Sequence, residues 1–104
     1  MAFTKIERNR VAIVGASGYG GLQLAKLISD HPYFDITYLG GESSAGKSWN
    51  YLNPFINLDK DHTIVSPDID DIAKAADYVI LSLPNGLSSQ LTPILVDKGL
   101  RVLD

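Results

Sequence analysis

The chain has 104 residues, a length typical of one domain, and its 45% hydrophobic and 20% charged residues are ordinary for a globular protein. Its formal net charge of −3 speaks against a nucleic-acid partner, which needs a basic face, and the lack of cysteine excludes disulfides and a cysteine nucleophile within these residues. The sequence contains no apolar run near the ~20 residues of a membrane span and no signal-peptide core in residues 1–10, so we expect a cytoplasmic protein with no membrane partner.

The first part of the chain predicts a strand, a helix and a second strand. Residues 11–14 form a continuous apolar run, which is typical of a strand buried on both faces of a parallel sheet. From Gly21 the apolar residues recur at helical spacing as far as His31-Pro32, where the residue before proline is biased away from helix. Residues 34–39 then predict a strand that Gly40-Gly41 ends.

The middle of the chain is less regular. Residues 42–62 break every period and predict a long loop, with one helical turn at residues 49–52. Residues 62–65 predict a weak third strand. Residues 66–68 resemble a helix start, and the apolar positions of residues 69–76 give that helix a buried face.

The last part of the chain repeats the alternation of strand and helix. Residues 78–83 predict a strong strand, residues 84–86 a turn, and residues 87–96 a helix that Gly99 caps. Residues 100–103 begin a further strand. Strands that alternate with helices predict an α/β fold with a doubly wound, Rossmann-like parallel sheet of about five strands in the order 3-2-1-4-5.

Glycines join the first predicted strand to the first predicted helix. Gly15 permits a tight turn, Gly18 permits close approach of a pyrophosphate, and Gly21 permits the helix to pack closely on the sheet. Backbone amides at such a helix start bind phosphate without any lysine. The alternative interpretation is a glycine-rich turn without a ligand, with an exposed tyrosine covering it. The cofactor-binding residues predicted here are Gly15, Ser17, Gly18, Tyr19, Gly20 and Gly21.

A second candidate segment follows the second predicted strand. An acidic residue about 20 positions past the glycines usually holds the adenosine ribose, and Glu42 lies a little later. Its carboxylate favours the free 2′-hydroxyl of NAD, whereas the serines beside it and Lys47 favour the 2′-phosphate of NADP. A solvated polar loop remains the alternative. The predicted residues are Glu42, Ser43, Ser44, Ala45 and Gly46.

A third candidate segment follows the strand predicted at residues 78–83. In a doubly wound sheet the ligand lies at the carboxyl ends of the strands, where the strand order reverses. We therefore expect Leu83, Pro84 and Asn85 to face the same crevice as the glycines, the alternative being a simple turn. His31 and His62 have no partner at metal-ligand spacing, so we predict surface histidines and no metal.

Four segments, VAIVGASGYGG, LGGESSAGKS, ADYVILSLPNGLS and GLRVLD, together resemble the N-terminal part of the N-acetyl-gamma-glutamyl-phosphate reductase family. The pair Gly18-Tyr19 and the residues from Leu83 to Gly86 favour this family over the related aspartate-semialdehyde dehydrogenases. Family members often carry threonine at Gly20, histidine at Asn85 and arginine at Glu42, and the last difference leaves the preference for NADP open.

The resemblance implies an oxidoreductase of arginine biosynthesis that reduces N-acetyl-glutamyl 5-phosphate to the semialdehyde with NADPH, NAD being the other possible cofactor. A cysteine nucleophile and a histidine acid/base carry out that reaction in the family. Both lie beyond the end of this chain, so no catalytic residue is assigned here and the chain alone is expected to be inactive.

The same resemblance makes residues 1–104 an NAD(P)-binding domain, with the dinucleotide and a missing C-terminal catalytic domain as partners and a homo-oligomer as the full enzyme. Two other hypotheses stay open: a stand-alone NAD(P)-binding module, and a fragment of an aspartate-semialdehyde dehydrogenase.

Overall fold

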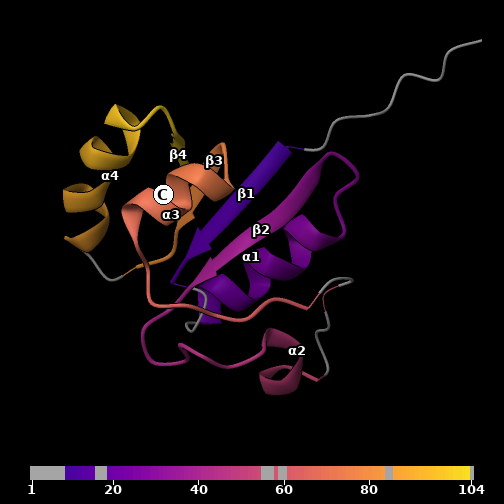
Figure 1. Ribbon diagram of the computed structural model, residues 1–104. Helices are drawn as coiled ribbons and strands as arrows, with labels where there is room; N and C mark the ends of the chain where they lie inside the picture. The colour runs from indigo at the N-terminus through magenta and orange to yellow at the C-terminus, as the bar shows by residue number, and fades with distance from the viewer. Residues whose placement is uncertain (1–8, 16–18, 55–57, 59–60, 84–85, 104) are drawn as a thin grey trace, which may run out of the picture.

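The chain folds around a parallel β-sheet. The computed structural model describes residues 9–15, 19–54, 58, 61–83 and 86–103. Its strands are β1 (Asn9–Val14), β2 (Phe34–Gly40), β3 (Tyr78–Leu81) and β4 (Arg101–Leu103). They form a four-stranded sheet in the order β2-β1-β3-β4, and each neighbouring pair is parallel (Figure 1). The predicted α/β class and parallel sheet are confirmed.

Helices cover both faces of this sheet. They are α1 (Tyr19–Ser29), α2 (Trp49–Leu52), α3 (Ile69–Ala75) and α4 (Leu87–Asp97). The helical turn predicted at residues 49–52 is confirmed by α2. Within the part of the chain that the structure describes, no helix is long and apolar enough to cross a membrane.

The strand predicted at residues 62–65 is wrong, and the sheet has four strands instead of five. Val65 makes a parallel bridge to Gly40, the last residue of β2, but Thr63 makes an antiparallel bridge to Ser48 of the loop instead of pairing with β2. On its other side, Ile64 exchanges hydrogen bonds with the loop, since its N–H donates to Lys47 O at 2.8 Å. The segment therefore lies beside β2, where the prediction put it, but bridges two neighbours and forms no ladder.

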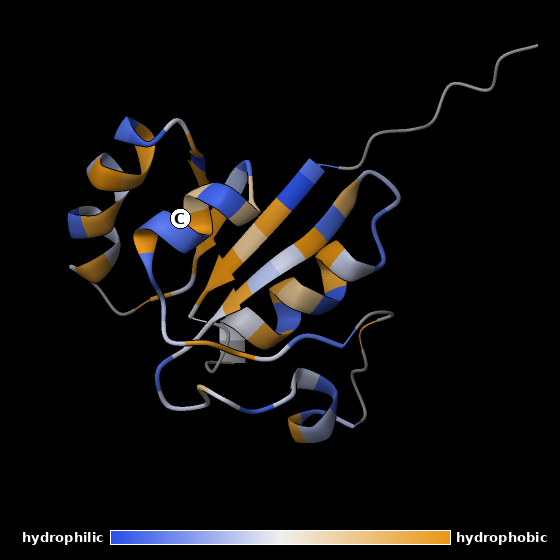
Figure 2. Cartoon of the chain, in the orientation of Figure 1, coloured by the Kyte–Doolittle hydropathy of each residue, from blue (hydrophilic) through white to orange (hydrophobic). Residues whose placement is uncertain are grey.

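Alternate residues of β1 point to opposite faces of the sheet and belong to two separate hydrophobic cores. Val11 and Ile13 pack with Ala25 of α1 and with Trp49 on one face of the sheet. Ala12 and Val14 belong to the core on the other face, which α3 and α4 complete. Figure 2 shows β1 as hydrophilic at its start and hydrophobic toward its arrowhead, and its last four residues are buried. A strand buried on both faces explains why the run is continuously apolar.

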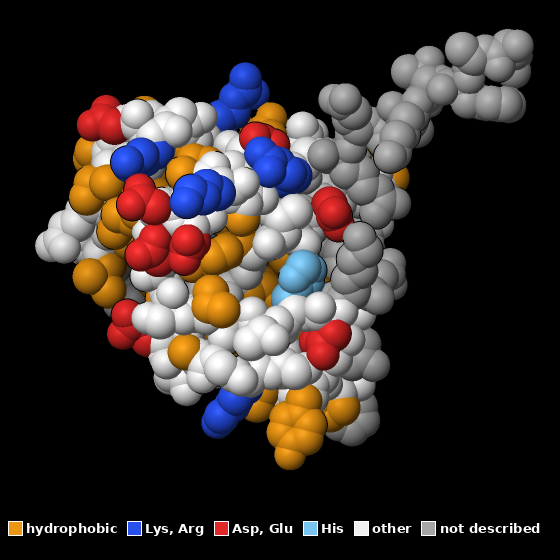
Figure 3. Space-filling view, in the orientation of Figure 1, with side chains coloured by type: hydrophobic (Ala, Val, Ile, Leu, Met, Phe, Trp, Pro, Cys, Tyr) orange, Lys and Arg blue, Asp and Glu red, His pale blue; other side chains and the backbone are white. Residues whose placement is uncertain are grey.

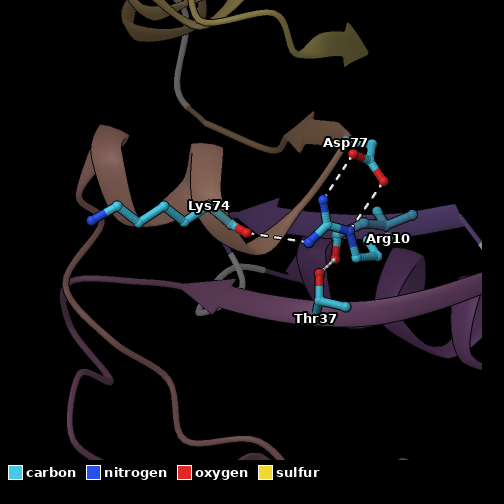
Figure 4. Close-up of polar contacts among 5 residues, drawn as sticks. Arg10, Thr37, Lys74 and Asp77 are labelled. Carbon is cyan, nitrogen blue, oxygen red and sulfur yellow. Dashed lines mark hydrogen bonds and ion pairs between the residues drawn. The ribbon is translucent and has the colours of Figure 1, made fainter.

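An ion pair between Arg10 and Asp77 lies at the amino-terminal edge of the sheet. Arg10 donates from Nη2 to Asp77 Oδ1 at 2.9 Å and from Nε to Oδ2 at 3.1 Å, so the pair is bidentate (Figure 4). Its Nη1 also donates to Lys74 O at 3.2 Å. The hydrogen bonds from the guanidinium lower the pKa of Asp77 and raise that of Arg10. These contacts tie the start of β1 to the end of α3 and the start of β3.

The same edge holds the end of α4. Gly99 has a φ of 87°, and its N–H donates to Val96 O at 2.9 Å, while Leu100 N–H donates to Leu95 O at 3.2 Å. This pair of bonds is the Schellman motif, which requires a left-handed residue after the helix. The predicted cap at Gly99 is confirmed.

Candidate functional site

The segments that follow β1, β2 and β3 meet at the carboxyl edge of the sheet. Gly15 N–H donates to Gly40 O at 2.8 Å, which joins the end of β1 to the end of β2. Ser82 N–H donates to Val14 O at 2.8 Å, which joins the end of β3 to the same point. The strand order places β1 between the other two, so this is the point where the direction of winding reverses.

Gly15 is packed so closely that no side chain fits there. Its φ is 95°, and a Cβ would lie 2.0 Å from Ser82 O and 3.3 Å from Leu83 Cδ2. A positive φ is a conformation that glycine adopts readily, and the turn predicted after it falls on residues 16–18, which lie outside the described residues. The backbone after β1 therefore lies directly against the backbone after β3.

The start of α1 faces the same segment. Gly20 and Gly21 lie in the first turn of α1, where Gly21 is buried and Gly20 is exposed. A Cβ added at Gly20 would lie 2.9 Å from Ser82 Oγ. The predicted residues Ser17 and Gly18 lie outside the described residues, and Tyr19 is described as the first residue of α1 only.

The loop after β2 presents the second group of predicted residues. Two successive turns shape it: Ala45 N–H donates to Glu42 O at 3.3 Å, and Lys47 N–H donates to Ser44 O at 3.2 Å. Gly46, with a φ of 88°, anchors the loop through its N–H, which donates to Ile64 O at 2.7 Å. All predicted residues of this loop are exposed except Ser44, which is half-buried; the set is Glu42, Ser43, Ser44, Ala45 and Gly46.

A second anchor fixes the loop behind α2. Ser48 caps α2 by accepting a hydrogen bond from Tyr51 N–H at 3.2 Å, and its hydroxyl donates to Asp61 Oδ2. Asp61 also accepts from Asn50 N–H at 3.0 Å, and these hydrogen bonds, that from Ser48 first, lower its pKa. Trp49, the first residue of α2, is fully buried. The described residues on either side of α2 are thus hydrogen-bonded to one another around one buried aromatic side chain.

The segment after β3 leads into α4. Leu83 is half-buried against the loop at Gly15, whereas the predicted residues Pro84 and Asn85 lie outside the described residues. α4 begins after Gly86, which has a φ of 94° and supplies no side chain to cap the helix. The start of α4 lies at the end of the sheet toward which the arrows of β1 and β2 point (Figure 1).

One residue of this segment was missed by the sequence analysis. Ser88 is 5% exposed, and its Oγ has no hydrogen-bond partner among the described residues. The available signal was a small polar residue on the apolar face of a predicted helix, since Leu91 and Leu95 follow it at spacings of three and seven.

The charged and titratable groups that the structure describes outside this edge form no site of their own. His31 is exposed, as predicted, and its Nδ1 accepts a hydrogen bond from Tyr33 N–H at 3.1 Å, while His62 is half-buried. Among the residues that the structure describes, no group of three or more histidine, cysteine, aspartate or glutamate side chains could hold a metal ion. On the face shown in Figure 3 the lysine and arginine side chains are scattered among acidic ones and form no basic patch.

Comparison with known sequences gives a consistent family. The family model described as "Semialdehyde dehydrogenase, NAD binding domain" matches residues 10–104. Two relatives from Prochlorococcus marinus, strains NATL2A and MIT 9211, are 59% and 54% identical over all 104 residues, and each is named N-acetyl-gamma-glutamyl-phosphate reductase. The resemblance inferred from the sequence motifs is therefore confirmed. The chain spans 29% of the length of these curated relatives.

Solved structures share the fold. An aspartate semialdehyde dehydrogenase with NADP from Candida albicans aligns with a TM-score of 0.74 and 24% identity, covering 92% of this chain and 29% of that one. An aspartate semialdehyde dehydrogenase II from Vibrio cholerae aligns with a TM-score of 0.66 and 23% identity, covering 92% of this chain and 30% of that one. At this identity the likeness concerns the arrangement of strands and helices.

Proposed function

The chain belongs to the semialdehyde dehydrogenase family through its NAD-binding domain, and from this premise we propose that its carboxyl edge binds NADPH for an N-acetyl-gamma-glutamyl-phosphate reductase. One observation carries the proposal: Gly15 is hydrogen-bonded to the end of β2 and packed against the segment after β3, so all three predicted segments share one edge. This edge is where a doubly wound sheet binds nucleotides.

The residues at this edge fit a dinucleotide. Gly15 and Gly20 carry no side chain where they face Ser82. The first backbone amides of a helix have no partner within it, so we expect those at the start of α1 to donate to a phosphate group. We assign the pyrophosphate to the glycine loop, the adenosine ribose to the loop after β2, and the nicotinamide half to the segment after β3. The proposed contacts are Gly15, Ser17, Gly18, Tyr19, Gly20 and Gly21; Glu42, Ser43, Ser44, Ala45 and Gly46; and Leu83, Pro84 and Asn85.

The role of these residues is to bind and orient, while the bound cofactor supplies the hydride. This chain contains no cysteine, so the cysteine nucleophile that the family resemblance implies has to come from residues that this sequence does not include. For the whole reductase we propose that it reduces the acyl phosphate N-acetyl-glutamyl 5-phosphate, assembles into a homo-oligomer and is cytoplasmic.

Titration of the chain with NADPH and NADH tests the proposal. Isothermal titration calorimetry gives both dissociation constants, and circular dichroism establishes that the sample is folded. We expect a Kd below about 1 mM for at least one of the two cofactors, which corresponds to only about 4 kcal/mol of binding free energy. A folded sample that binds neither cofactor at millimolar concentration would rule the proposal out.

A further inference from the structure

A strap of residues 61–65 holds both ends of the loop after β2. Gly41 N–H donates to Val65 O at 2.9 Å, and Gly46 N–H donates to Ile64 O at 2.7 Å. Residues 42–45 therefore lie between two backbone hydrogen bonds whose acceptors are consecutive carbonyls of the strap. Because the two acceptors are adjacent in the chain, a shift of the strap moves both ends of the loop together.

Further backbone bonds fix the strap at each of its own ends. Val65 N–H donates to Leu39 O at 2.9 Å, and Trp49 N–H donates to His62 O at 2.8 Å. The strap thus runs between the carboxyl end of β2 and α2 (Figure 1). These bonds join main-chain atoms, so they form whichever side chains the strap carries.

Asp61 adds a side-chain anchor at the start of the strap. Its Oδ2 accepts a hydrogen bond from the Ser48 hydroxyl, and its Oδ1 accepts one from Asn50 N–H at 3.0 Å. These hydrogen bonds lower the pKa of Asp61, so its carboxylate is ionised at neutral pH and both bonds are charge-assisted. One exposed carboxylate therefore joins the strap to the cap and the first turn of α2.

We propose that Asp61 is a positioning residue for the cofactor, which acts through the strap to hold residues 42–46 in the conformation that accepts the adenosine half. This inference rests on the proposed function above, which assigns the adenosine ribose to that loop. A loop that is already ordered loses less conformational entropy when a ligand binds. The apparent affinity falls in proportion to the fraction of molecules whose loop has the binding conformation.

The charge of Asp61 gives positioning and simple electrostatics opposite signs. NADPH carries negative phosphates, so removal of a carboxylate strengthens its binding if long-range attraction alone decides. Loss of positioning weakens the binding instead. The direction of the change in affinity therefore separates the two effects.

Calorimetric titrations with NADPH and with adenosine 2′,5′-bisphosphate, which has no nicotinamide half, test the positioning role. We expect Asp61→Ala to weaken the binding of both probes by the same factor of about 5. Asp61→Asn should restore most of the affinity, because its amide keeps an acceptor for Asn50 N–H and offers a donor to the Ser48 hydroxyl. Asp97→Ala is the matched control: it removes an exposed carboxylate at the end of α4 and should keep both affinities within about 2-fold of wild type.

Amide hydrogen exchange without ligand gives a readout that a change in global stability does not reproduce. Asp61→Ala should speed the exchange of Gly41 N–H and Gly46 N–H by about 5-fold relative to Gly15 N–H, which is bonded to Gly40 O and not to the strap. Asp61→Asn should return both rates toward those of the wild type. A purely structural role of Asp61 would speed the exchange of all three amides by the same factor.

Ser48→Ala removes the other partner of the same hydrogen bond without changing the charge. It should weaken the binding of both probes by a factor similar to that of Asp61→Ala, and it decides the question if Asp61→Ala does not fold. Equal affinities of the wild type and these variants for the bisphosphate would overturn the positioning role and leave the proposed function in place.

Two other results also count against the positioning role. A loss of NADPH affinity without a loss of bisphosphate affinity would overturn it, because the effect would lie at the nicotinamide half. A folded wild-type chain that binds neither probe would overturn the proposed NADPH site and the positioning role with it.

Discussion

The two ends of the sheet use their polar groups in opposite ways. At the amino edge, Arg10 and Asp77 form a bidentate pair, and the end of α4 satisfies its carbonyls through Gly99. At the carboxyl edge, Gly15 leaves no room for a side chain, α4 starts without a side-chain cap, and Ser88 has a buried hydroxyl without a partner among the described residues.

This difference separates stability from binding. At the amino edge, Arg10, Asp77 and the end of α4 find their partners within the described residues, so these groups stabilise the fold. Groups at the carboxyl edge are held in place by backbone hydrogen bonds while some of their donors stay open. Substitutions of side chains at the amino edge should change unfolding alone, whereas substitutions at the carboxyl edge should change binding and, at the closely packed Gly15, unfolding as well.

The largest effect is expected for Gly15→Ala. The added Cβ would lie 2.0 Å from Ser82 O at a φ of 95°, so backbone strain and displacement should together destabilise the fold by about 2–5 kcal/mol. Gly99→Ala is the matched control at the amino edge, because its φ is 87° and nothing lies within 4 Å of its Cβ; it should cost about 1–2 kcal/mol. Urea unfolding measures both, and equal costs would contradict the close packing at Gly15.

A smaller effect is expected for Asp68→Ala. Loss of the cap on α3 should destabilise the chain by about 1 kcal/mol, while Asp68→Asn, which keeps an acceptor, should restore most of it. Because α3 satisfies its own start, NADPH affinity should not change in either variant. Thermal unfolding measures the change in stability, and calorimetry measures the affinity for NADPH. A loss of NADPH binding in Asp68→Ala would show that the start of α3 also contributes to the binding site.

Glu42→Arg changes the choice of cofactor. The carboxylate is exposed on the loop assigned to the adenosine ribose, so replacing it with a cation should improve the affinity for NADPH relative to NADH by about 5-fold at low salt. For Glu42→Gln, which only removes the charge, the ratio of the two dissociation constants should lie between those of the wild type and Glu42→Arg. An unchanged ratio of the two dissociation constants would place Glu42 away from the bound ribose.

The smallest effect is expected for Asp77→Asn at the amino edge. The pKa of Asp77 is lowered in the fold by its hydrogen bonds from Arg10, so the pair stabilises the fold above the ordinary aspartate pKa of about 4 and stops doing so as the pH falls through the lowered value. The Tm difference between wild type and variant should therefore be small at pH 7 and vanish in stronger acid. Asp30→Asn, which breaks the exposed pair with Lys26, is the control. A change in NADPH affinity in Asp77→Asn would contradict the claim that residues at the amino edge affect stability and not binding.

Periodicity predicted the elements with strong local signals. The apolar run of β1, the capped start of α3 at Asp68 and the glycine after α4 each depend on a few neighbouring residues. The strand predicted at residues 62–65 failed because Thr63 and Ile64 pair with the loop at residues 46–48 instead of extending the bridge to β2, and no local pattern records that pairing.

The candidate site was predicted only in part for the same reason. Gly15 and the loop after β2 stand out by residue type and spacing, and the structure brings them to one edge. Ser88 looks like an ordinary helix residue in the sequence, and only the structure shows that its hydroxyl is buried without a partner among the described residues. The contact between Gly15 and Ser82 likewise depends on the pairing of β1 with β3.

Amide chemical shifts measured during a titration with NADPH test the separation of the two edges most directly. With ¹⁵N-labelled chain, we expect shifts for Gly15, residues 40–46, residues 82–83 and residues 87–88, and unchanged signals for Arg10, Asp77 and Arg101. Shifts confined to the amino edge, or none at millimolar NADPH in a folded sample, would contradict this expectation.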